Sequence, residues 1–275
     1  MELPPFGLSA IAKLPISLPE VQRPLRKRRA LLRRESGFGL VEMLCALVVL
    51  SVGVLAVIAM FESGVKQLRR ASTVTTAGAI AESQMEKFRE LKFESLGVPD
   101  SLAAGADATY KGDPAFRADT TPTTTLAAAL SASATSLTVT SASGFPAVAP
   151  FRVKLGSEIV LVSRGAGTTQ WTVTRAMDGT VAGSYAAGTS LVWKQRVAVA
   201  ACGSPPCTTI VPTATVPGAD RRSYRVDTYA TWRTIDTGAA TGRQVKVMTV
   251  VVRDSQSPAK VWARASSSFD EATGL

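Results

Sequence analysis

Few residues of this chain have the types and spacing that enzyme chemistry needs. The 275 residues include no histidine, which removes histidine-based acid–base catalysis, Ser-His-Asp triads and every zinc site with an imidazole ligand. Three cysteines are too few for a disulfide scaffold or an all-cysteine zinc site. No cluster in the C-terminal two thirds has the composition of a catalytic site. We therefore expect a protein that is not an enzyme and that uses no metal and no cofactor.

Two of the cysteines, Cys202 and Cys207, enclose the sequence Gly-Ser-Pro-Pro. Thiols can oxidise outside the cytoplasm, and a turn with two prolines could bring the two sulfur atoms together. We predict a disulfide, because two thiolates without nearby imidazoles do not make a metal site and the spacing is not Cys-x-x-Cys. Cys45 lies in an apolar run and is expected to act as a small hydrophobic residue, with lipidation as the alternative.

One acidic residue, Glu42, stands where a charge is unfavourable. It opens an apolar run, Met43–Phe61, of 19 residues without a charge. As a helix this run is about 28 Å long, against about 30 Å for the hydrocarbon core of a bilayer. Residues 1–37 contain eight basic and three acidic residues, which places the N-terminus in the cytoplasm and the bulk of the chain outside. A carboxylate at the edge of a membrane span needs a functional reason.

Two ordinary interpretations of the apolar run leave Glu42 without a role. A secretory signal peptide cut near Val57-Ile58-Ala59 fits the basic residues, but its apolar region would be only about 7–15 residues long. A simple N-terminal anchor fits the length of the run. The sequence around Glu42 supplies a third interpretation.

The border of the run reads Gly37-Phe38-Gly39-Leu40-Val41-Glu42, after basic residues and before the apolar helix. Residues 33–61 resemble the prepilin signal of type IV pilins and type II secretion pseudopilins, although the 37-residue leader is longer than the shortest in that family. The resemblance implies that a membrane prepilin peptidase cuts between Gly37 and Phe38 and N-methylates Phe38. It also implies an assembly role for Glu42, whose buried carboxylate can be neutralised by the α-amino group of a neighbouring subunit's Phe38. The alternative is that Glu42 merely lies among lipid headgroups.

A single helix is predicted from about residue 39 to about residue 95. No proline occurs between Phe38 and Val98, and Gly97 and Pro99 then supply a stop signal. After the transmembrane part, 38–61, the helix is amphipathic, with apolar residues three or four positions apart at Ala77, Ala81, Met85, Phe88 and Leu91. Residues 97–122, rich in Gly, Pro, Asp, Ala and Thr, are predicted to form a surface loop.

Beyond residue 122 the sequence predicts β structure. Candidate strands are Ser136–Thr140, Phe151–Leu155, Glu158–Ser163, Gln170–Arg175 and Ser190–Ala200, with a hairpin at Gly165-Ala166-Gly167. The stretch 123–193 resembles a small β module of phage and other virion structural proteins, through segments such as Glu158–Val162, Trp171–Arg175 and Asp178–Thr180. Relatives often carry His where this chain has Tyr185. The resemblance implies an inserted display or attachment module; the alternative is that these are simply strands of a pilin head.

Two alternating runs near the C-terminus, Tyr224–Trp232 and Gln244–Val252, predict an antiparallel hairpin, and Lys260–Ser266 predicts a third strand. A helix followed by such a sheet resembles the heads of minor pilins and pseudopilins. The predicted fold is therefore α+β: a long N-terminal helix packed on an antiparallel head, with an inserted all-β module. The predicted divisions are the leader 1–37, the helix 38–96, the loop 97–122, the module 123–193 and the head 194–275.

The resemblance implies a structural function, as a minor subunit of a type IV pilus or related secretion pseudopilus. Its partners would be the prepilin peptidase, other pilin subunits, the assembly platform and the membrane. The chain would be a single-pass precursor in the cytoplasmic membrane and then part of an extracytoplasmic filament. The alternative is an adhesin or DNA-uptake pilin with a basic patch made by Arg221, Arg222, Arg225 and Arg233, although nucleic acid is not expected as a partner because such arginines are usually a solvated face.

Overall fold

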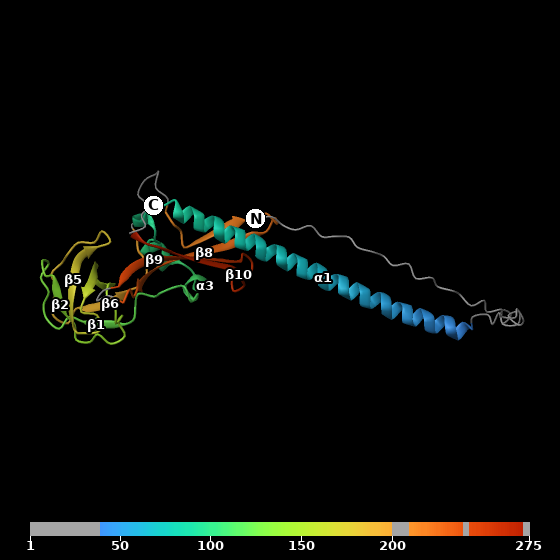
Figure 1. Cartoon of the computed structure of the whole chain (residues 1–275), viewed down its shortest axis with the longest axis horizontal. Coiled ribbons are helices and arrows are strands. Elements are labelled where there is room, and N and C mark those ends of the chain that lie inside the picture. The colour runs from blue at the N-terminus through green and yellow to red at the C-terminus, as the bar shows by residue number, and fades with distance from the viewer. Residues whose placement is uncertain (1–38, 200–208, 239–241, 272–275) are drawn as a thin grey trace, which may run out of the picture. The chain divides into compact units, whose positions relative to one another are not determined.

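The computed structural model describes residues 39–199, 209–238 and 242–271. In these ranges a long helix, three short helical segments and ten strands form a mixed α+β fold with two antiparallel sheets (Figure 1). The predicted fold class is confirmed. The chain divides between Phe61 and Glu62 into two compact units, and each is described by itself.

The long helix, α1, spans Leu40–Arg89. Its first part is apolar and exposed, with a mean hydropathy of 2.9 over its most apolar 18 residues. Among the described residues α1 is the one helix long and apolar enough to cross a membrane. Its second part buries one stripe of side chains, at the spacing of three and four expected for an amphipathic helix: Thr73, Ala77, Ile80, Ala81, Met85 and Phe88.

The helix ends about six residues before the predicted end. Lys92 is extended, with φ −62° and ψ 145°, and the short 3₁₀ segment η1 follows at Phe93–Ser95. The ammonium group of Lys246 donates to the carbonyl oxygens of Phe93, at 2.5 Å, and Leu96, at 2.8 Å. These tertiary hydrogen bonds satisfy carbonyl groups of η1 and of the residue after it, and so hold the turn that follows α1.

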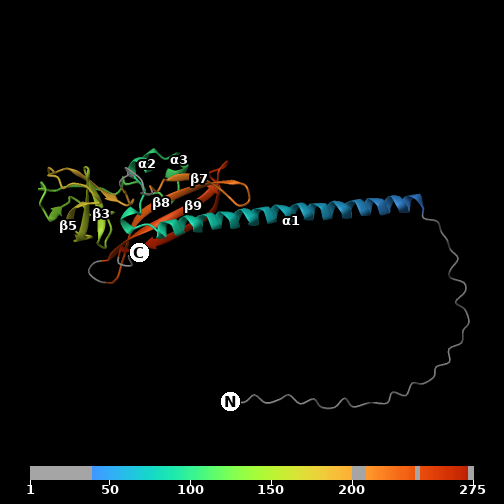
Figure 2. The same cartoon turned by 90° about the horizontal axis from the view of Figure 1, so that it is seen from above.

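The second part of α1 packs on a four-stranded antiparallel sheet of order β10-β9-β8-β7 (Figure 2). Its strands are β7 (Thr213–Pro217), β8 (Ser223–Ile235), β9 (Arg243–Asp254) and β10 (Val261–Phe269). The predicted hairpin and third strand are confirmed, whereas β7 was not predicted. Strand alternation turns Tyr224, Val226, Met248, Val250 and Val252 toward α1, so the sheet and the helix share one core.

A second sheet has six strands in the order β1-β6-β3-β4-β5-β2. They are β1 (Thr123–Thr125), β2 (Ser136–Thr138), β3 (Phe151–Leu155), β4 (Glu158–Arg164), β5 (Gln170–Met177) and β6 (Ser190–Lys194). A bridge between Leu126 and Val139 joins the ends of the two edge strands, so the sheet closes into a small barrel. Trp171 is fully buried in the barrel core and meets Phe151 and Phe145 edge-on, with ring centroids 5.4 and 5.3 Å apart.

The five strands predicted in this region are present: β3 has the predicted ends, the other four end at a different residue than predicted, and β1 was missed. β6 stops at Lys194 rather than at residue 200, because the backbone N–H groups of Gln195 and Arg196 donate to the Asp119 carboxylate, at 2.8 and 3.0 Å. Tyr185 stands in an isolated bridge with Leu130 and its ring packs against Gly156 and Gly183.

The surface loop predicted at 97–122 contains two short helices, α2 (Asp100–Gly105) and α3 (Ala108–Lys111). The carboxylate of Asp107 accepts the N–H of Tyr110 at 2.8 Å and so caps α3. Tyr110 is 2% exposed and stacks on Tyr229 of β8, with centroids 4.4 Å apart. Contacts to a strand more than a hundred residues away therefore order a segment that has no periodic pattern of its own.

Candidate functional site

Glu42 lies in the first turn of α1, and its backbone N–H donates to the carbonyl of Gly39 at 2.9 Å. A carboxylate in this position is favoured by the partial positive charge of the helix N-terminus. Its neighbours Leu40, Val41 and Met43 are between 67% and 81% exposed. Burial of this turn therefore requires a membrane or another molecule.

The other residues of the predicted processing site, Gly37 and Phe38, lie outside the described residues, as do Cys202 and Cys207. Their cleavage, N-methylation and disulfide roles stay predictions. Cys45 is a free, exposed thiol on the apolar part of α1.

Sequence reasoning missed an ion network on the face of the four-stranded sheet opposite α1. At its centre the fully buried carboxylate of Asp227 accepts from Nε of Arg225 and Nε of Arg253, both at 2.8 Å, and from the Thr213 hydroxyl at 2.9 Å. All three donors come from the same sheet, on β7, β8 and β9. The network therefore ties together three neighbouring strands.

The same arginines hold the α2–α3 segment to the sheet. The guanidinium of Arg225 also donates to both carboxylate oxygens of Asp107, and Nη2 lies 2.8 Å from Oδ1. Arg253 and Arg264 both donate to the carboxylate of Asp113, whose Oδ2 is 2.8 Å from Nη2 of Arg264. Three carboxylates thus face three guanidinium groups, which is the pairing that buried charges require.

The network lowers the pKa of two of its carboxyl groups. Hydrogen bonds from Arg225 hold the pKa of Asp107 well below its usual range. Burial alone would raise the pKa of Asp113, but the hydrogen bonds and charges of Arg264 and Arg253 outweigh it and leave that pKa lowered.

Acidification is expected to destabilise the four-stranded sheet below about pH 4, the pKa of an aspartate in an unfolded chain. Since the folded-state pKa values are depressed, the stabilisation is complete above that pH and is lost as the pH falls toward the folded values. Urea unfolding of the full chain in detergent between pH 7 and pH 2 measures the loss. Asp113→Asn should flatten this dependence, because one of the titrating groups is then absent. An unfolding free energy that stays constant down to pH 2 would contradict the prediction.

Two further clusters lie between the barrel and the rest of its unit. The Lys194 ammonium is 1% exposed and bonds to the carboxylates of Asp119, at 2.6 Å, and Asp100, at 2.9 Å. Nε of Arg196 lies 3.0 Å from the same Asp119 carboxylate. These contacts fix the point at which the chain leaves β6.

The second cluster is formed by Arg152 of β3, whose guanidinium lies 3.6 Å from the ring centroid of Trp232 on β8. Arg152 also donates to Gln244, and its Nε lies 3.2 Å from the carboxylate of Asp178. The Lys246 ammonium lies 5.4 Å from the centroid of the Trp232 ring, and burial lowers the pKa of this ammonium to about 8. The residues of this cluster also line an open cavity of about 370 Å³.

A buried carboxylate also organises the barrel. Glu158 is fully buried and accepts four hydrogen bonds: two from Arg175 at 2.7 Å, one from Ala176 N–H at 3.0 Å and one from Gly183 N–H at 3.1 Å. Arg175 donates further to the carbonyls of Ser131 and Gly183, both at 2.6 Å. Burial alone would raise the pKa of Glu158, but the hydrogen bonds from Arg175 leave it lowered. The pair therefore pins the loop after β5 to β4.

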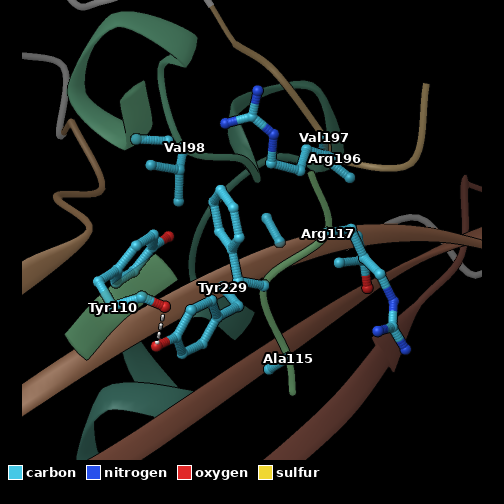
Figure 3. A pocket seen from close by; sticks show the side chains of 11 residues that line it. Val98, Tyr110, Ala115, Arg117, Arg196, Val197 and Tyr229 are labelled. Atoms are coloured by element: carbon cyan, nitrogen blue, oxygen red, sulfur yellow. Dashed lines mark hydrogen bonds between the residues drawn. The ribbon is translucent and has the colours of Figure 1, made fainter. Parts of the chain in front are cut away.

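The pocket beside Tyr110 and Tyr229 offers no room for a ligand (Figure 3). The Tyr229 hydroxyl donates to the Tyr110 carbonyl at 3.1 Å, and the Tyr110 hydroxyl donates to the Thr228 carbonyl at 2.7 Å. Both hydroxyls are thus satisfied within the chain, and the remaining cavity of about 10 Å³ holds one water molecule at most. This pocket is part of the core.

The four arginines considered as a nucleic acid patch do not form one exposed surface together. Arg225 is 8% exposed and fully engaged with Asp107 and Asp227. Alternation along β8 places Arg225 on the face of the sheet that the α2–α3 segment covers. The sequence around Arg225 did not indicate this burial. Arg221 and Arg222 are exposed in the turn before β8, whereas Arg233 is exposed further along that strand.

Comparison with known families identifies one match, to the model described as the prokaryotic N-terminal methylation motif, over residues 32–58. No curated protein matches the chain. The prepilin-like character of the N-terminal segment is thereby confirmed, whereas the resemblance of 123–193 to a virion module stays a prediction. The motif and the long apolar helix support a membrane-anchored precursor of the type IV pilin or pseudopilin kind, generally a structural and not an enzymatic protein. Such a signature implies processing by a prepilin peptidase and assembly with other pilins.

Proposed function

We propose that this chain is a minor structural subunit of a type IV pilus or a related type II secretion pseudopilus. The main support for this proposal is that one helix has two different surfaces: an exposed apolar part that starts at Glu42 and a part buried against a β-sheet. The first surface suits packing among other helices in lipid or in a filament, and the second holds the head. A head that adds a closed barrel to its sheet is bulky for a subunit repeated along a filament, which favours a minor subunit at the tip.

In this proposal the peptidase cuts between Gly37 and Phe38 on the cytoplasmic side and N-methylates Phe38. Glu42 then becomes the fifth residue of the mature chain and pairs with the α-amino group of a neighbouring subunit. The direct test is mass spectrometry of the N-terminus of the processed protein. A start at N-methylated Phe38 supports the proposal, whereas a start near Met60 or at Met1 would replace it with a secreted protein or a plain anchor.

Replacing Glu42 by alanine is expected to spare membrane insertion and cleavage but to reduce filament incorporation strongly. A pair that is broken leaves one uncompensated buried charge, worth about 3–5 kcal/mol, so incorporation should fall at least a hundredfold. Quantitative immunoblotting of sheared filaments measures it. Glu62→Ala is the matched control, because Glu62 is exposed on the same helix and makes only a surface pair with Lys66, 3.8 Å away. Normal incorporation of the Glu42 variant would remove the assembly role.

We also propose that residues 123–193 are an insertion into the head. β1, where the segment begins, pairs antiparallel with β6, where it ends, so the chain enters and leaves the barrel on neighbouring strands. An insertion needs this arrangement, because removing it must leave two ends that a short link can join. The disulfide between Cys202 and Cys207 is part of the same proposal for the extracytoplasmic head, and thiol alkylation before and after reduction tests it.

A further inference from the structure

The stripe of α1 that faces the sheet changes character where the sheet ends. Thr73, Ala77 and the residues after them are buried. Lys66, Arg69 and Arg70 precede Thr73 by seven, four and three residues, so they lie on the same face of the helix. All three are exposed, and they are basic. The face that is apolar under the sheet is therefore positively charged just beyond it.

Two turns of the sheet end beside this face. The β7–β8 turn is closed by the N–H of Gly218 and the carbonyl of Arg222, 2.7 Å apart. Nη1 of Arg222 lies 3.4 Å from the Thr73 hydroxyl, which itself donates to the Arg69 carbonyl at 2.9 Å. Arg222 is thus within one helical turn of Arg69.

The β9–β10 turn adds one more basic residue, Lys260, at the same end. Tyr224 pairs with Asp254, so the two turns are neighbours, and a cleft of about 510 Å³ between them is lined by Arg221, Arg222 and Trp262. The Lys260 ammonium lies 3.8 Å from the Trp262 ring. We call the exposed basic side chains at this end the basic surface; its members are Lys66, Arg69, Arg70, Arg221, Arg222 and Lys260.

Three acidic residues lie near the basic surface: Glu62, which pairs with Lys66 at 3.8 Å, Asp220 and Asp254. Asp254 accepts the N–H groups of Gln256, at 2.9 Å, and Ser257, at 3.2 Å. Asp220 accepts the hydroxyl of Tyr224 at 2.7 Å, and its contact with Arg222 is long, at 3.9 Å. Within the described ranges, Arg69, Arg70 and Arg221 make no ion pair. The six basic residues of the basic surface outnumber these three acids, so the surface keeps a net positive charge.

We propose that the basic surface binds the phosphate groups of anionic phospholipids in the membrane that holds the apolar part of α1. This inference rests on the membrane anchoring in the proposed function. Lys66 follows Phe61, the end of the apolar run, by only five residues, and Arg70 follows it by nine. Clustered basic side chains close to a span are attracted to an anionic leaflet, and a partly buried tryptophan such as Trp262 suits the interface. The contact would hold the head against the membrane until the subunit is extracted.

The test uses the full chain in vesicles of phosphatidylcholine alone or of equal parts phosphatidylcholine and phosphatidylglycerol. Vesicle flotation measures insertion, and hydrogen exchange measures protection of the amides at 218–222 and 254–260. We expect exchange at both turns to be several-fold slower with phosphatidylglycerol, and the difference to shrink in high salt. The triple variant Arg70→Gln/Arg221→Gln/Lys260→Gln should lose the difference. The control Lys111→Gln/Lys154→Gln/Arg164→Gln removes the same charge from α3 and the barrel. It should keep the difference in exchange between the two lipids.

Three other results of this experiment would contradict the proposal. A chain that floats with the vesicles but exchanges equally in both lipids overturns the lipid contact and leaves the anchor intact. A chain that does not float overturns both. A DNA duplex that protects the turns in phosphatidylcholine vesicles as strongly as phosphatidylglycerol does would make this a nucleic acid site and the lipid assignment wrong.

Discussion

Replacing Glu158 by alanine is expected to destabilise the barrel by about 3–5 kcal/mol. The substitution removes the carboxylate partner of Arg175, whose side chain is 8% exposed, and leaves a charged guanidinium inside the protein. It also leaves the N–H groups of Ala176 and Gly183 without their acceptor. An unpaired buried donor is destabilising by itself, so these losses act in the same direction.

Hydrogen exchange of the β4 and β5 amides in the full chain measures the effect, because it reports the opening of the barrel separately from that of the other sheet. Glu158→Gln should lose less, since the amide oxygen still accepts hydrogen bonds. The matched control is Glu82→Ala, an exposed carboxylate on α1 that should change stability by no more than about 0.5 kcal/mol. Opening free energies in β4 and β5 that stay within the range of this control would mean that the cluster is not stabilising.

The elements that were predicted from the sequence are those with a local repeat. The spacing of Ala77, Ala81 and Met85 specifies a helix face, and the alternation in Tyr224–Trp232 and Gln244–Val252 specifies strands, whatever the rest of the chain does. The missed strands are short: β1 has no apolar residue, and β7 has only Ala214 and Val216 in alternation, which is too few to indicate a strand. They are strands because a longer neighbour offers them a free edge, which a local pattern does not record.

The ion network shows the same limit at the level of single residues. Arg225 and Asp107 are 118 positions apart, and nothing near either residue marks it as buried. The sequence placed Arg225 with Arg221 and Arg222 as exposed charge, whereas the pairing of β8 with β7 and β9 turns it under the α2–α3 segment. Glu42 is different, because an acid beside an apolar run is conspicuous in the sequence itself. A candidate such as Glu42 can therefore be proposed from the sequence alone, whereas residues that hold a fold together internally depend on its topology.

Replacing Asp227 by alanine is expected to destabilise the four-stranded sheet by about 3 kcal/mol, the lower end of the range for a broken buried pair. Asp227 is fully buried between Arg225 and Arg253, but each arginine keeps a second carboxylate, on Asp107 and Asp113. Arg175 has no second carboxylate partner among the described residues. Glu158→Ala should therefore lose more stability than Asp227→Ala.

Hydrogen exchange of the β8 and β9 amides measures how much stability the sheet loses in Asp227→Ala. Comparison with the barrel amides of Glu158→Ala shows which of the two variants loses more. Glu90→Ala is the control for the loss of an exposed carboxylate. The α2–α3 segment should exchange faster as well, because the two arginines that hold it lose their common anchor. If Asp227→Ala were the more damaging of the two variants, the outer carboxylates would not compensate for the central one, and the network would act as a single unit rather than as overlapping pairs.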